Sequence, residues 1–102
     1  MAYYVKTYNH RISNYCKDIF EARYKAFGYI MSHKKDEIFI HEEKSGDVVG
    51  FVYWNKKKDK YGRVLGPCYW SDKTGKDYLL DLDGKIFDMK TDRKVPGQYR
   101  RR

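Results

Sequence analysis

The residues with the clearest chemical potential are cations gathered in two short windows. Residues 55–63 have the sequence NKKKDKYGR, and residues 92–102 have the sequence DRKVPGQYRRR. Each window holds five Lys or Arg and one Asp, so the two together account for the whole formal charge of +8. The remaining charges are balanced. Positive charge localised in this way favours a polyanion or an acidic protein surface as the partner.

The first window is predicted to be a loop over 55–62. Lysines on such a loop neutralise phosphates and release counterions, while a neighbouring Tyr can stack on a base. The arginines at the C-terminus can act in the same way. The competing interpretations are a solvated turn and a terminal tail without function. The predicted binding residues are Lys56, Lys57, Lys58, Lys60, Tyr61, Arg63, Tyr99, Arg100, Arg101 and Arg102.

Aromatic residues form a second candidate surface. They make up 18% of the chain, and 11 of them are Tyr, which tolerates a half-buried ring with a wet hydroxyl. Alternation along the expected strands places several rings on one sheet face, where they could stack on unpaired bases. A second small core beneath the tail and a homodimer seam are the alternatives, and a register error of one residue would exchange the two faces. The predicted aromatic face comprises Phe39, His41, Phe51, Tyr53 and Tyr69, with Leu65 beside them.

Metal chemistry and catalysis find little support. The three histidines and the two cysteines are scattered, so we expect no metal site and no cofactor. Residues 81–84 resemble the start of a calcium loop, but a hairpin turn explains them better. His41, Tyr61 and Arg63 could serve a metal-independent ribonuclease, yet nothing in their spacing indicates one. Enzyme activity is therefore not expected.

The location of the protein is expected to be cytoplasmic. No apolar run is long enough to span a bilayer, and the N-terminus lacks the charged-then-apolar pattern of a signal peptide. We therefore expect no membrane partner. Cys16 falls on the apolar stripe of a predicted helix, so it is expected to be a buried thiol and not a disulfide partner.

The element expected to organise the fold is a long helix over 13–35. Ser13 or Asn14 would cap its start, and cations follow at its end. Gly28 is expected to admit a close neighbour, and Arg23 to lay its methylenes on the core with its head in water. The predicted apolar stripe comprises Cys16, Ile19, Phe20, Arg23, Phe27, Ile30 and Met31, which recur at helical spacing.

Strands are predicted on both sides of this helix. One is expected over 2–8, and the others over 37–43, 48–54, 63–70, 76–82 and 85–88, with a bulge or edge at Gly66 and Pro67. The expected fold is α+β: one long helix on an antiparallel meander of four to six strands, in the order β-α-β-β-β-β. It would form a single domain over 1–91, followed by a flexible basic tail over 92–102. The residues expected to face the helix are Ile38, Ile40, Val48, Val52, Leu80 and Leu82.

These features favour a small basic nucleic-acid-binding protein that uses the lysine-rich loop and the arginine tail. The alternative is a protein-interaction module, an inhibitor or adaptor, that docks through the aromatic face or a strand edge. A metal-independent ribonuclease is the third hypothesis. DNA and RNA are both open as ligands, and a homodimer is open as the oligomeric state.

Overall fold

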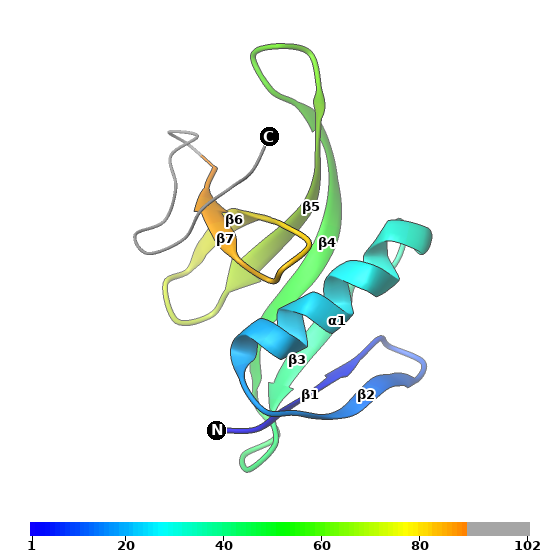
Figure 1. Ribbon diagram of the computed structural model, residues 1–102, viewed down its shortest axis with the longest axis vertical. Coiled ribbons are helices and arrows are strands. Elements are labelled where there is room, and N and C mark those ends of the chain that lie inside the picture. The colour runs from blue at the N-terminus through cyan, green and yellow to red at the C-terminus, as the bar shows by residue number, and fades with distance from the viewer. Residues whose placement is uncertain (90–102) are drawn as a thin grey trace.

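The computed structural model describes residues 1–89, in which one α-helix packs on a seven-stranded antiparallel sheet. The strand order in the sheet is β2-β1-β3-β4-β5-β6-β7. Figure 1 shows α1 lying across one face of this sheet. The elements are β1 (Tyr3–Lys6), β2 (Arg11–Cys16), α1 (Ile19–Ser32), β3 (Ile38–Glu42), β4 (Val48–Lys58), β5 (Val64–Ser71), β6 (Lys76–Leu80) and β7 (Ile86–Asp88). The α+β class and the antiparallel sheet are confirmed, whereas the basic tail lies outside the described residues.

The first part of the predicted helix is a strand instead. β2 pairs with β1 as a hairpin, and α1 begins only after the N-cap Asp18. The Asp18 carboxylate accepts from the Glu21 N–H at 2.8 Å, and the Glu21 carboxylate accepts from the Lys17 N–H at 2.7 Å. The first bond satisfies an N–H group that the first turn leaves unpaired, and the second holds the residue before the cap. The prediction of Ser13 or Asn14 as the cap is therefore wrong.

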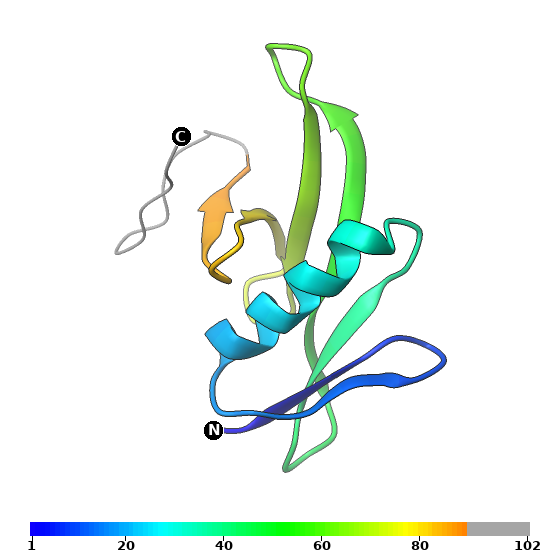
Figure 2. The ribbon, with the colours of Figure 1, turned by 45° about the vertical axis from the view of Figure 1, so that its right-hand side comes forward.

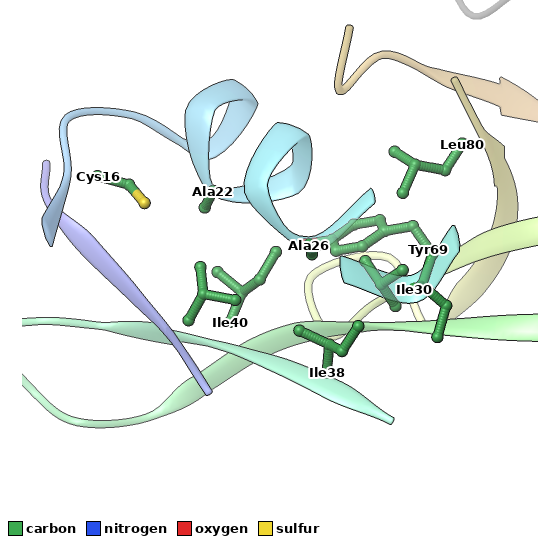
Figure 3. Close-up of a cluster of buried hydrophobic side chains, with 10 residues drawn as sticks. Cys16, Ala22, Ala26, Ile30, Ile38, Ile40, Tyr69 and Leu80 are labelled. Atoms are coloured by element: carbon green, nitrogen blue, oxygen red, sulfur yellow. The ribbon is translucent and has the colours of Figure 1, made fainter. Parts of the chain in front are cut away.

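The main core lies between α1 and the sheet, as Figure 3 shows. Its helical side is built mainly from Ala22, Ala26 and Ile30, whereas Phe20 and Met31 are exposed to 45% and 44%. The buried stripe is thus rotated from the predicted one, toward the face that carries the two alanines. The buried members of this core are Val5, Cys16, Ala22, Ala26, Ile30, Ile38, Ile40, Val52, Tyr69 and Leu80.

Arg23 enters this core and does not reach into water as expected. Only 6% of the residue is exposed, and its Nε donates to the Gly84 carbonyl oxygen at 2.7 Å. The guanidinium carbon lies 4.9 Å from the ring centre of Phe20 and 5.1 Å from that of Tyr69. Burial lowers the pKa of Arg23, although a guanidinium stays charged at neutral pH. Arg23 therefore ties α1 to the turn between β6 and β7.

Two residues predicted to face the helix do not. Ile40 pairs with Gly50, but His41 pairs with Val48, so the β4 strand contains an extra residue at this point. Val49 consequently packs against the core, while Val48 is 37% exposed. Leu82 lies beyond the end of β6 and is 55% exposed. The predictions for Val48 and Leu82 are wrong because a bulge and an early strand end change the alternation.

A second, smaller cluster lies on the sheet face away from α1, which we call the distal face. Cys68, Leu79 and Phe87 are buried there, and Tyr53, Leu65 and Met89 pack against them. A second small core beneath the tail was one of the alternatives expected for this face from the sequence. The cluster occupies the part of the face between β5 and β7, so it leaves the part between β1 and β4 to other residues.

Because Cys68 is buried, the free energy of unfolding is expected to change with pH in the alkaline range. Desolvation raises the pKa of this thiol from 9.0 to about 12. The unfolded chain therefore releases the proton above pH 9, whereas the folded chain holds it until about pH 12. The contribution of Cys68 is fully present below pH 9 and decreases as the pH rises toward 12. We expect wild type to lose about 1 kcal/mol at pH 10 relative to Cys68→Ala.

Urea unfolding of both proteins between pH 7 and pH 10.5 measures this difference. The tyrosines that titrate in the same range are common to both chains, so those that do not contact Cys68 cancel, and Tyr53, which interacts with Cys68, is replaced by Phe in both proteins. A gap between wild type and Cys68→Ala that stays constant with pH would contradict the assignment.

Candidate nucleic-acid interface

The first basic window forms the far end of a long β-hairpin. β4 extends to Lys58 and β5 begins at Val64, so residues 56–58 belong to a strand. Figures 1 and 2 show that this hairpin projects beyond α1 and the rest of the sheet. The loop predicted over 55–62 is therefore wrong for its first half. Lysine has a low β-propensity, but the pairs of Asn55 with Gly66 and of Lys58 with Val64 hold β4 against β5 on both sides of an irregularity at Lys56 and Lys57.

Asp59 organises the turn at the end of the hairpin. Its Oδ1 accepts from the backbone N–H groups of Tyr61 at 2.8 Å and Arg63 at 2.9 Å. Gly62 adopts a φ of +80°, and its N–H donates to the Asp59 carbonyl oxygen. The Arg63 and Tyr61 N–H groups keep the pKa of Asp59 below its usual value. The Asp59 carboxylate also lies 3.4 Å from Arg63 Nε, so Arg63 is the cation of this turn whose charge is partly offset.

The predicted binding residues of this window gather around one exposed ring. Tyr61 is 66% exposed, and its ring centre lies 5.2 Å from Lys60 Nζ and 5.2 Å from Arg63 Cζ. The exposed cationic and aromatic side chains at this end of the hairpin are Lys56, Lys57, Lys58, Lys60, Tyr61 and Arg63. We call these six residues the basic tip. The other predicted cations, Arg100, Arg101 and Arg102, lie with Tyr99 outside the described residues.

The base of the hairpin receives a further cation from the segment after α1. Lys34 Nζ lies 4.3 Å from the centre of the Trp54 ring. Trp54 also covers Gly66, whose φ is +78°. The pairing register shifts between Asn55 and Lys58, next to this glycine. The irregularity predicted near Gly66 is therefore present, whereas the contact of Lys34 with Trp54 was not predicted from the sequence.

A row of aromatic rings crosses the distal face from β1 to β5. Ring centres are 5.0 Å apart for Tyr8 and Phe39, 5.9 Å for Phe39 and Phe51, 5.5 Å for Phe51 and Trp70, and 5.6 Å for Phe51 and Tyr53. Tyr8 is 75% exposed, and the other four are partly exposed. We call these five residues the aromatic row.

His41 lies next to this row in a separate stacked pair. Its ring is 4.7 Å from the Tyr4 ring and nearly parallel to it. On Tyr4, the second member of this pair, the Arg11 guanidinium carbon lies 4.1 Å from the ring centre. Phe39, Phe51, Tyr53 and His41 thus share the face on which the sequence placed them, and Tyr4 extends it.

Tyr69 does not belong to the aromatic face. It is only 3% exposed and packs in the main core on the α1 side of the sheet. Leu65 lies on the distal face as expected, but the positive φ of Gly66 breaks the alternation between Leu65 and Tyr69. Trp70 therefore takes the distal position, opposite Phe51. If the alternation along β5 is counted from the residue that pairs with Phe51, it places Trp70 on the distal face. If it is counted from Leu65, it places Tyr69 there instead.

The three groups considered for a ribonuclease are not brought together. His41 pairs with Val48 at the start of β4, whereas Tyr61 and Arg63 lie beyond its other end. Ten steps of about 3.3 Å along this strand separate the two ends by about 33 Å. Among residues 1–89, no three His, Cys, Asp or Glu side chains gather closely enough to hold a metal ion.

No helix within the described part of the chain is long and apolar enough to cross a membrane. Comparisons with models of known protein families, with curated protein sequences and with solved structures find no match for this chain. The case for a function is therefore built on the geometry and charge of the basic tip and the aromatic row.

Proposed function

We propose that this protein binds nucleic acid and that the basic tip is its main contact with phosphates. The observation that carries the proposal is the concentration of four lysines and one arginine at the end of a projecting hairpin. These side chains are exposed, so phosphates can reach them, although Arg63 already shares its charge with the Asp59 carboxylate. Tyr61 offers an exposed ring among them.

The chemistry of the tip favours contacts with the backbone of the nucleic acid. Lysine is a flexible point charge, so it contacts phosphates without the fixed two-pronged geometry by which arginine recognises guanine. Binding of this kind releases counterions and weakens steeply with salt. The role of the arginine tail stays a prediction; its cations would add to the same release of counterions.

Charge reversal of Lys56, Lys57 and Lys58 to Glu tests the proposal. We expect binding of a fluorescein-labelled 12-nucleotide DNA to weaken at least tenfold in 50 mM NaCl. The slope of log K against log salt is negative, and each lost phosphate contact reduces its magnitude by about 0.7. The slope should therefore become shallower by about 2. Fluorescence anisotropy between 50 and 300 mM NaCl measures both quantities.

A second triple variant provides the matched control. Lys25, Lys44 and Lys73 are exposed and lie in α1, the β3–β4 turn and the β5–β6 turn, away from the hairpin tip. Their reversal to Glu changes the net charge by the same amount. We expect this control to retain most of the affinity and the salt slope. Equal losses in the two triples, or unchanged binding in the first, would refute the role of the tip.

A protein-interaction module is the second candidate, because β2 is an outer strand of the sheet within residues 1–89. An outer strand offers backbone N–H and C=O groups to an added strand, and Tyr15 on β2 is 60% exposed. An acidic partner could also meet the basic tip. A complex that survives nuclease treatment would favour this candidate over the first, and size-exclusion chromatography would reveal a homodimer.

A further inference from the structure

The aromatic row has the dimensions of a stacking platform. Its successive ring centres lie 5.0 to 5.9 Å apart, and all five rings are at least partly exposed. Stacking of a base on such a ring contributes to the binding of single strands and tolerates any sequence, because every base has a flat face. A row that crosses several strands can engage more than one base.

The charges beside the row are mixed in sign, because the Tyr8 hydroxyl donates to the Glu37 carboxylate at 3.2 Å, so the preference for an anionic occupant comes from the basic tip. Lys6 pairs with Phe39 on one side and with Arg11 on the other, so both cations share the distal face with the rings. The carboxylate of Asp77, opposite Trp70, accepts a hydrogen bond of 2.7 Å from the Tyr53 hydroxyl.

The row and the basic tip lie along one strand. Phe51 and Tyr53 belong to β4, which continues to Lys58. Five residues of strand span about 17 Å, so a ligand of several nucleotides can touch both surfaces. A duplex keeps the faces of its bases stacked inside and presents only their edges in the grooves. Only an unpaired strand can therefore use the row and the tip together.

We infer that the preferred ligand is single-stranded nucleic acid, whose bases stack on the aromatic row while its phosphates contact the basic tip. This inference rests on the proposed function and adds the class of nucleic acid to it. It assigns Tyr8, Phe39, Phe51, Tyr53 and Trp70 as the base-binding residues.

The two tryptophans of the chain allow a direct test, because they occupy different surfaces. In Trp54→Phe, Trp70 of the row is the sole tryptophan, and in Trp70→Phe the sole tryptophan is Trp54 at the base of the hairpin. Each variant is titrated with a mixed-sequence 12-nucleotide DNA and with the duplex that it forms with its complement. We expect the single strand to quench Trp70 strongly and Trp54 only weakly. The single strand should also bind at least tenfold more tightly than the duplex.

Exposed tyrosines supply a variant that does not threaten the fold. Tyr8→Ala removes the outermost ring of the row, and Tyr24→Ala removes an exposed ring from α1 as the matched control. We expect Tyr8→Ala to weaken single-strand binding about fivefold and to leave duplex binding unchanged, whereas Tyr24→Ala changes neither.

The outcomes separate this inference from the proposed function. Tip-dependent binding without quenching of Trp70, without a strand preference and without an effect of Tyr8→Ala would overturn the inference alone. Absence of binding to either DNA would overturn both. If poly-glutamate quenches Trp70 as strongly as the oligonucleotide, the row binds an acidic protein surface and the inference fails.

Discussion

Replacing Gly50 with alanine is expected to lower the free energy of unfolding by about 3 kcal/mol. Gly50 is buried in β4, beneath the ring of Tyr69. A methyl group there would collide with the ring carbon and hydroxyl of Tyr69 and lie 2.6 Å from the Trp70 carbonyl oxygen. Tyr69 has little room to move because it packs in the main core beside Arg23. The cost should appear in urea unfolding followed by far-UV circular dichroism.

The opposite result is expected at Gly28, which serves as the control. Gly28 is exposed in α1, and a methyl group there meets nothing within 4 Å, so the close neighbour predicted for it is wrong. Because Ala is the better helix former, Gly28→Ala should stabilise the protein by up to about 1 kcal/mol. A change at Gly50 within about 0.5 kcal/mol of wild type would show that β4 and β5 yield easily there.

Replacing Gly84 with alanine should cost a similar amount, for two reasons that can be separated. Its φ is +82°, a conformation that costs other residues about 1–2 kcal/mol. A methyl group would also collide with the Phe20 carbonyl oxygen and lie 3.1 Å from the Tyr24 nitrogen, both in the backbone of α1. We expect a total loss of about 3 kcal/mol, because the turn must move away from the helix.

Gly75 isolates the first of these reasons. Its φ is +67°, but a methyl group there meets nothing within 4 Å. Gly75→Ala should therefore show only the conformational cost of about 1–2 kcal/mol. The excess at Gly84 measures the contact between the turn and α1, and equal losses at both glycines would disprove that contact.

Arg23 should be coupled to Gly84. If the turn shifts, the hydrogen bond from Arg23 Nε to the Gly84 carbonyl lengthens or breaks. In an Arg23→Met background this bond is already absent, so Gly84→Ala should cost less there than in wild type. Unfolding measurements on the two single variants and the double variant complete the cycle.

Local patterns were sufficient to predict much of the fold. The strands predicted over 37–43 and 48–54 are present as β3 and β4, which pair as an antiparallel hairpin. The start of α1 was missed because Cys16 also fits a helical stripe and because Ser13 and Asn14 are residue types that can cap a helix. Asp18 followed by Glu21 was the usable signal, since this spacing forms the reciprocal cap observed here.

The two candidate surfaces differ in how far the sequence could predict them. The basic tip is contiguous in sequence, so its residues could be named without knowing the fold. The aromatic row depends on pairing register, and the bulge near Val49 and the positive φ of Gly66 both disturb the alternation. Contacts such as that between Arg23 and Gly84 join distant parts of the chain. Such contacts cannot be predicted from a local sequence pattern.

The topology of the sheet also bears on the order in which the chain assembles. Among residues 1–89, β1 and β3 are the paired strands that are not consecutive in sequence, and α1 lies between them. Closing that ladder costs more chain entropy than forming any of the neighbouring hairpins. The meander from β3 to β7 can therefore form early, and β1 with β2 docks later. The projecting hairpin belongs to the early part, so it can fold before the N-terminal strands reach their place.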